Sequence, residues 1–260
     1  MRALILIATL LTLLPAVDAA AGEPTRVVVH VLAHDAKLIG TVAGGVEVTI
    51  REAATDVLIA RGMQEGGTGS TDDLVREPWV RGEDRMTTGD AASFEATLDL
   101  DRPTRVVVSA RGPLGFPNAE FRTSREVLVV PGAHLDGDGV VLTLQGLIVN
   151  LLTPHTEANL QAGETLGIEA GVKLLCTCPL EADGLWDAAD YAVRAELWRG
   201  DTMVTSTPLA FDGRPNVFAG DLTLPTPLED ESDVHELRIV AGNAATGNWG
   251  SDHAVFRVRP

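Results

Sequence analysis

From residue 25 onward, hydrophobic and polar positions alternate along the chain with a period of two. The alternation is strict in 46–52 and 94–100, which is the pattern of strands with one buried face and one face in solvent. Residues 27–32 are instead almost continuously hydrophobic and rich in valine. No segment has the sustained apolar period of a capped helix. The sequence therefore predicts an all-β protein.

Further strands are expected along the whole chain. They are placed at 105–110, 126–130, 140–144, 147–152, 167–176, 191–198, 217–224, 235–240 and 252–258. Short strands separated by turn sequences favour sandwiches or barrels over α/β units. A chain of 260 residues is also long enough for two hydrophobic cores. We predict two β-sandwich domains in tandem, over 23–147 and 148–260, with the boundary near Gly146 to Pro154.

Residues 1–21 are predicted to be a signal peptide. Arg2 supplies the positive charge, and residues 3–17 form an apolar core of 15 residues, followed by small residues. A membrane-spanning helix needs ~20 apolar residues, so export with cleavage is favoured over an uncleaved anchor. The mature protein is expected to be secreted or periplasmic, with no membrane span after cleavage.

The charge of the chain restricts its partners. It has 20 basic and 37 acidic residues, which gives a formal net charge of −17. A surface this acidic repels phosphate backbones, so no nucleic-acid partner is expected.

One hairpin resembles a known family. Val46–Glu52 is a valine-rich strand that leads through a polar turn to the segment Thr55–Gly62. This pair resembles the opening hairpin of transthyretin-like, carboxypeptidase-regulatory-like domains, over roughly residues 26–110. The second half resembles bacterial Ig-like modules from about residue 148, without the disulfide spacing of antibody domains. Both resemblances imply accessory, spacing or binding modules without catalytic residues.

Two cysteines form the sequence Cys176-Thr177-Cys178-Pro179. Side chains at i and i+2 of a strand share a face, so two thiolates side by side are able to bind Cu(I) or Zn(II). His155, His235 and His253 are available to complete such a site, and His155 is the preferred third ligand. The alternatives are a local disulfide or two small buried side chains, and apart from this metal no cofactor is expected.

The connection between Gln64 and Ala92 is long, glycine-rich and charged. Connections of this length without regular structure are often flexible, or they bind partners. Trp79, with Arg76 and Arg81, is a candidate protein-binding anchor because Trp and Arg dominate interface hot spots. The glycines lack the lysine and the helix of a phosphate loop.

No catalytic constellation is recognisable. There is no G-x-S-x-G elbow, and carboxylates are too abundant to mark an acid/base pair. Two acidic turns, 136–139 and 183–190, are compatible with calcium, although tight turns explain them equally well. The leading hypothesis is a non-catalytic binding or adaptor protein of the envelope or extracellular space with a protein partner. The alternative is an extracytoplasmic copper or zinc protein that uses the C-x-C pair.

Deleting residues 2–19 is expected to keep the protein in the cytoplasm, because the apolar core that directs export is lost. In the intact protein, N-terminal sequencing of the exported form is expected to start between Ala20 and Gly22. An exported protein that retains Met1 contradicts the prediction.

Overall fold

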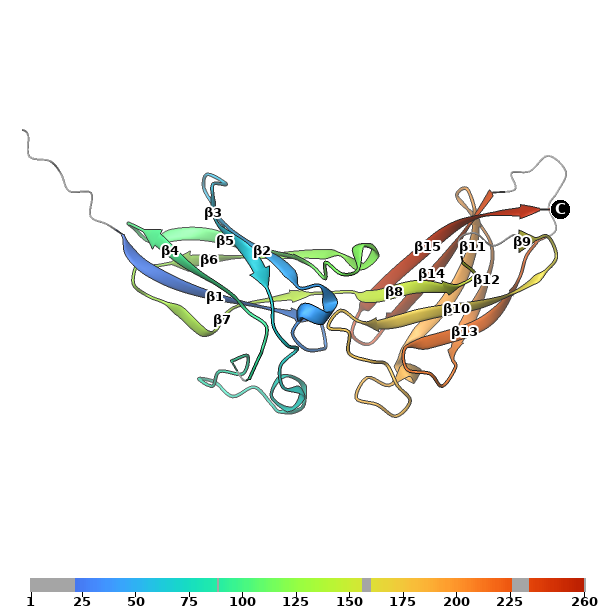
Figure 1. Ribbon diagram of the computed structural model, residues 1–260, viewed down its shortest axis with the longest axis horizontal. Helices are drawn as coiled ribbons and strands as arrows, with labels where there is room; N and C mark the ends of the chain where they lie inside the picture. Colours follow the sequence, from blue (N-terminus) through green and yellow to red (C-terminus); the bar gives the residue numbers. More distant parts are fainter. Residues whose placement is uncertain (1–21, 88, 156–159, 226–233, 260) are drawn as a thin grey trace, which may run out of the picture.

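The described residues form two β-sandwiches that lie end to end (Figure 1). The computed structural model describes residues 22–87, 89–155, 160–225 and 234–259. Strands dominate, and the helical segments are four turns of three to five residues. No helix in these ranges is long and apolar enough to cross a membrane. The predicted all-β class is confirmed, while the predicted signal peptide lies outside the described residues.

The first unit contains two sheets. Its strands are β1 (Glu23–Ala33), β2 (Val46–Glu52), β3 (Leu58–Gln64), β4 (Phe94–Leu100), β5 (Thr104–Gly112), β6 (Phe121–Val129) and β7 (Leu135–Leu144). One sheet has the order β4-β1-β7, with β1 and β7 parallel, and the other is antiparallel with the order β3-β2-β5-β6. The core between them consists mainly of valine, isoleucine and leucine side chains.

Strand β1 is buried on both faces, which explains its continuous apolar sequence. Val27, Val29 and Val31 face the core between the sheets. The other face of the β1–β7 pair is covered by the segment that follows β3. A small second cluster forms there from Leu38, Leu74, Met86 and Ala92, with Leu32 and Val141 packed against it.

The hairpin predicted from the valine-rich segment is present. β2 and β3 pair antiparallel from Val46 with Gln64 to Arg51 with Leu58. The polar turn between them includes Asp56 at a positive φ of 58°. The assignment of the first unit to transthyretin-like domains stays a prediction.

The second unit has Ig-like strand order. Its strands are β8 (Leu147–Thr153), β9 (Leu160–Gln161), β10 (Thr165–Leu174), β11 (Ala192–Arg199), β12 (Thr202–Phe211), β13 (Val217–Thr223), β14 (Val234–Asn243) and β15 (Asn248–Arg259). They are ordered β8-β10-β13-β12-β11-β14-β15-β9. The groups β8-β10-β13 and β11-β14-β15 correspond to the ABE and CFG groups of an Ig-type sandwich. β12 connects the two groups at one edge, pairing with β11 and, through Ala210 and Phe211, with β13.

The sequence did not predict β12. Only Leu209 of this strand is fully buried, and Pro208 interrupts it near its end. A strand at the edge of a sandwich exposes most of its side chains, so it lacks a clear alternation. β15 is likewise longer than expected, because Asn248, Gly250 and Ser251 in its first part do not continue the apolar alternation.

Strand pairing changes partners between β7 and β8, close to the boundary predicted near Gly146. Two residues, Gln145 and Gly146, connect these strands. Asn248 of β15 fixes the connection: its side-chain oxygen accepts the N–H of Gly146 at 2.6 Å, and its amide nitrogen donates to the carbonyl of His34 at 3.3 Å. Trp186 Nε1 also donates to the carbonyl of Asp35 at 2.8 Å.

Replacing Asn248 with alanine is expected to lower the free energy of unfolding by about 1–3 kcal/mol, because a buried backbone N–H loses its acceptor. Asn248 is only 2% exposed, so water does not readily replace the lost contact. Small-angle scattering is expected to show a broader range of inter-unit angles. Gln145→Ala, which changes an exposed side chain of the connection and leaves the Asn248 contacts intact, is the control. Equal behaviour of Asn248→Ala and the wild type contradicts this role.

Candidate functional site

The two cysteines form a disulfide with each other. Cys176 and Cys178 are joined directly, and both side chains are buried. Thr177 between them has a positive φ of 64°, which is the turn that brings the two sulfur atoms together. In this state the thiolates of the metal hypothesis are absent, and metal binding by this pair stays a prediction that applies to the reduced protein.

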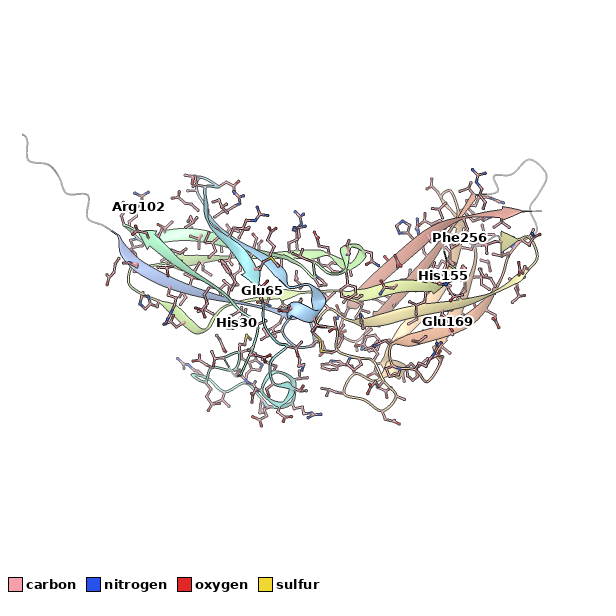
Figure 2. All side chains as sticks on the ribbon, in the orientation of Figure 1. His30, Glu65, Arg102, His155, Glu169 and Phe256 are labelled. Carbon is pink, nitrogen blue, oxygen red and sulfur yellow. A yellow bond between two sulfur atoms is a disulfide. The ribbon has the colours of Figure 1, made fainter. Side chains whose placement is uncertain are left out.

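His155 lies far from the cysteines. Thr153, two residues before it, pairs with Glu169 of β10, and His155 and Glu169 lie in the same unit (Figure 2). The cysteines instead follow Leu174, the last residue of that strand. Seven residues separate Glu169 from Cys176, a span of roughly 20 Å along extended chain. Within the described ranges, no three His, Cys, Asp or Glu residues are grouped to hold a metal ion. The structure therefore does not assemble the predicted ligand set.

The segment after β3 is not the structureless connection that its sequence suggested. It contains a π-helical turn, Asp72–Arg76, in which Arg76 pairs with Asp72 at 2.8 Å. Trp79 is 59% exposed, and the guanidinium of the buried Arg85 lies 5.1 Å from its ring centre. Arg81 is exposed nearby. The three predicted anchor residues thus lie on one ordered surface segment, and their role in partner binding stays a prediction.

Carboxylates of the two acidic turns, 136–139 and 183–190, form contacts within the protein. Asp138 accepts the backbone N–H groups of Arg85 and Met86 at 2.7 and 2.8 Å. Asp136 forms an ion pair with Arg26, and Asp187 accepts the N–H of Ala189 at the start of a short helical turn. Asp136, Asp138 and Asp187 therefore have partners within the protein.

A groove of about 800 Å³ lies at the junction of the two units. We call it the elbow groove. The first unit contributes Asn118, Glu120 and Phe121, from η3 (Pro117–Ala119) and the start of β6, where the chain approaches β15 (Figure 1). The second unit contributes the outward faces of β11, β14 and β15, including Glu196, Glu236, Arg238, Trp249, Ser251, Asp252 and His253.

Two aromatic side chains of the elbow groove pack on glycines. The indole of Trp249 covers Gly242, its cross-strand neighbour, so closely that no Cβ fits there. The ring of Phe121 covers Gly146 in the same way. Trp249 is nevertheless 42% exposed. Glycine thus lets the indole lie on the sheet while it still presents a surface to the groove.

A charged network holds one wall of the groove. Glu196 accepts hydrogen bonds from Arg194 Nε at 2.6 Å and from Trp198 Nε1 at 2.9 Å. Arg238 lies with its guanidinium 4.8 Å from the Trp198 ring centre and bonds to Glu236. The hydrogen bond from Arg238 lowers the pKa of Glu236 below its usual range, and burial of that carboxyl opposes this only in part. The carboxylates of this wall are therefore charged at neutral pH.

Sequence reasoning did not find the elbow groove. Its residues come from four separated stretches, and only the tertiary structure brings them together. The sequence contained one signal for this surface. Every second residue of β11 is charged or aromatic, namely Arg194, Glu196 and Trp198, which places these side chains on the face of the strand away from the core.

No family model matches this chain, and no curated protein matches it in sequence. Among solved structures, a DUF3823 family protein from Bacteroides ovatus aligns with a TM-score of 0.32 and 10% identity, over 89% of this chain and 98% of that one. Fibronectin(III)-like modules of Clostridium thermocellum CbhA align with a TM-score of 0.27 and 12% identity, over 94% and 92%. An engineered protein aligns with a TM-score of 0.30 and 16% identity over 48% of this chain, which spans only 22% of that protein's length. At these scores, none of the three bears on what this chain binds.

The ion pair of Glu236 predicts a specific pH dependence of stability. Because the folded-state pKa of Glu236 is lowered, its contribution is present above the unfolded value of roughly 4.3 and is lost as the pH falls through the folded value. Glu236→Gln is expected to lower the free energy of unfolding at pH 7 by up to about 1 kcal/mol. In urea titrations across the pH range, the difference from wild type is expected to vanish once the pH falls below the folded-state pKa of Glu236, which lies below the unfolded value.

Glu83→Gln is the matched control, because Glu83 is exposed and has no ion pair among the described contacts. It is expected to unfold like the wild type at every pH. A Glu236→Gln difference that persists unchanged at low pH contradicts the assigned cause.

Proposed function

We propose that this chain is a non-catalytic, exported binding or adaptor protein that holds a protein partner in the elbow groove. The observation that carries the proposal is the exposed indole of Trp249, presented at a groove to which both units contribute. Tryptophan and arginine anchors dominate binding energy at protein interfaces, and Trp249 and Arg238 both line the groove.

The charge of the groove indicates the partner's chemistry. Glu120, Glu196, Glu236 and Asp252 line it, and Arg238 is the one Lys or Arg among its described lining residues. Glu236, Glu196 and Glu120 are paired with Arg238, Arg194 and Arg111, which leaves Asp252 as the carboxylate of the lining without an ion pair among the described contacts. A partner segment that inserts a basic side chain next to the indole fits both the charge and the aromatic surface, since a guanidinium stacks favourably on tryptophan.

The β-sandwich strand orders of the two units support a spacing role for the part of the chain outside the elbow groove. We propose that the first unit is a transthyretin-like domain, on the basis of the β2–β3 hairpin, and that it holds the Ig-like unit at a set angle. Export to the periplasm or medium, inferred from residues 1–21, is part of this proposal.

Site-specific crosslinking in cells that naturally make the protein tests the function. A photoreactive phenylalanine analogue at Ser251, two residues from Trp249 on the same strand face, is expected to give one discrete crosslinked protein, identified by mass spectrometry. Trp249→Ala is expected to remove this product, because the anchor is lost. Trp79→Ala is the matched control and is expected to leave it unchanged.

A second arm tests the charge of the partner. Fluorescein-labelled peptides of alternating glycine and arginine are expected to bind the purified protein more tightly than glycine–glutamate peptides, by fluorescence anisotropy. The proposal is wrong if Trp79→Ala, and not Trp249→Ala, abolishes the crosslink, since the segment after β3 is then the binding surface.

A further inference from the structure

The sheet β3-β2-β5-β6 is positively charged within a strongly acidic chain. Its four strands contain six arginines and three glutamates, a local net charge of +3, whereas the whole chain carries −17. The arginines are Arg51, Arg61, Arg105, Arg111, Arg122 and Arg125. This sheet therefore attracts anions that the chain as a whole repels.

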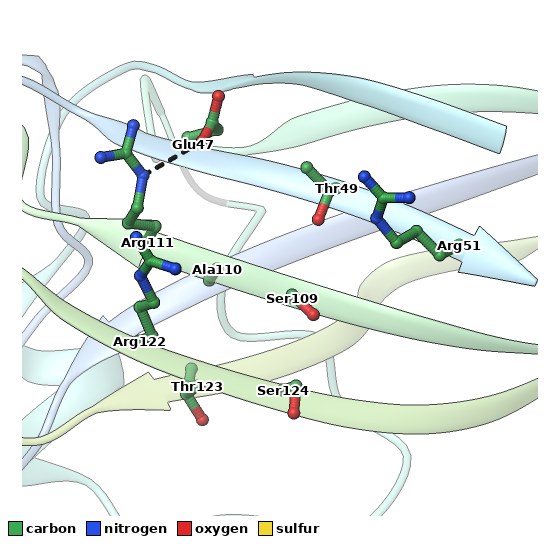
Figure 3. Close-up of a pocket in the computed structure, with 9 residues that line it drawn as sticks. All are labelled: Glu47, Thr49, Arg51, Ser109, Ala110, Arg111, Arg122, Thr123 and Ser124. Carbon is green, nitrogen blue, oxygen red and sulfur yellow. Dashed lines mark hydrogen bonds and ion pairs between the residues drawn. The ribbon is translucent and has the colours of Figure 1, made fainter. Parts of the chain in front are cut away.

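A depression of about 560 Å³ lies on the outward face of this sheet. Figure 3 shows Thr49, Ser109 and Ser124 between Arg51 on one side and Arg111 and Arg122 on the other. We call it the arginine trough, with floor residues Thr49, Ser109 and Ser124 and wall residues Arg51, Arg111 and Arg122.

Strand register explains the shape of the trough. Thr49 pairs with Ser109, and Ser109 pairs with Ser124, so the three hydroxyls form one row across three strands. Two residues along, Arg111 pairs with Arg122 on the same face. A row of short side chains between long ones leaves the hollow.

The floor and two of the walls have unused hydrogen-bonding capacity. Among the described contacts, the hydroxyls of Thr49, Ser109 and Ser124 have no side-chain hydrogen bond within the protein, and each is able to donate and accept. Arg122 is 76% exposed and approaches only Glu120, at 3.9 Å. Arg51 Nη1 donates to the carbonyl of Asp56 at 2.8 Å and lies 3.7 Å from the exposed Asp56 carboxylate, and its other N–H groups have no partner among the described contacts.

Arg111 has a different role. Its guanidinium bonds to Glu47 at 3.1 Å and to Glu120 at 2.9 Å. Because Arg111 is paired with both carboxylates, its side chain is held in place as a wall of the trough. The paired carboxylates of Glu47 and Glu120 repel an incoming anion less than unpaired carboxylates would. Arg51 and Arg122 remain as the two groups able to bind a ligand.

The distance between these groups defines the ligand. Arg51 lies four residues along the sheet from the row of Arg111 and Arg122, which is about 13 Å. One small oxyanion cannot contact both ends, whereas a chain with repeated anionic groups can. The hydroxyl floor suits the hydroxyls of sugar rings, and the trough has no aromatic side chain on which nucleic-acid bases stack.

We infer that the arginine trough binds an acidic polysaccharide. Its carboxylate or sulfate groups pair with Arg51 and Arg122, and its ring hydroxyls bond to the row of Thr49, Ser109 and Ser124. This inference does not depend on the protein partner of the elbow groove, because the two sites differ in residues and in charge.

Isothermal titration calorimetry of the purified exported protein at low ionic strength tests the inference. Oligogalacturonate supplies carboxylates, a heparin-derived oligosaccharide of similar length supplies sulfates, and a neutral galactose oligosaccharide is the uncharged control. At least one acidic oligosaccharide is expected to bind, and the neutral one is not. Comparing the two acidic probes shows which anion the trough prefers.

Two kinds of variant separate charge from hydroxyl contacts. Arg51→Gln/Arg122→Gln is expected to weaken binding at least ~10-fold and to reduce its dependence on salt, because two charge-assisted contacts are lost. Ser124→Ala is expected to weaken binding less and to leave the salt dependence unchanged. Arg81→Gln, which removes one exposed charge outside the trough, is the matched control and is expected to bind like the wild type.

Several results overturn the inference. They are a lack of binding to both acidic oligosaccharides, equal binding of the neutral one, and equal weakening by Arg81→Gln and the double variant. Tighter binding of oligoglutamate than of either acidic oligosaccharide assigns the trough to an acidic protein instead. Complete competition by millimolar inorganic sulfate shows a site for a small anion and also contradicts a polymeric ligand.

Discussion

The two-residue connection between β7 and β8 is the constraint on which the junction of the two units and the elbow groove depend. Gly146 has a φ of 153° and lies against the ring of Phe121, so a side chain at this position has no space. Its N–H is held by Asn248 of β15. Because the connection is short and bonded on both sides, the start of β6 is placed against β15, and the elbow groove forms there.

Positive and negative charges lie on different parts of the molecule, although the chain as a whole carries a net charge of −17. The elbow groove is acidic, and the arginine trough next to it is cationic. Glu120 belongs to both regions, since it lines the groove and also pairs with Arg111 of the trough. A ligand in one site therefore affects the electrostatic potential in the other, and the two units together present a polar surface larger than either site alone.

The segment between Gln64 and Ala92 stabilises the first unit by covering it. Strand β1 and its parallel neighbour β7 expose Leu32 and Val141 on the side away from the main core, and the segment covers this apolar surface with Leu74 and Met86. Asp138 attaches its far end through the N–H groups of Arg85 and Met86. Burial of this kind gives a long, glycine-rich connection a fixed path.

The sequence by itself determined the all-β class, most of the strands and the β2–β3 hairpin, because these follow from local alternation and turn residues. It also left a local disulfide as one alternative for Cys176 and Cys178. Two residues so near in the sequence are able to form a bond without help from any other part of the fold. It did not reveal β12, whose exposure at an edge removes the alternation. Only the tertiary structure decided that His155 lies at the opposite end of a strand from the cysteines, that Trp249 meets Phe121 in one groove, and that Arg51 and Arg122 border one row of hydroxyls. Those relations depend on strand pairing across long stretches of sequence, and pairing is set by the burial of whole sheets rather than by the residues that line a site.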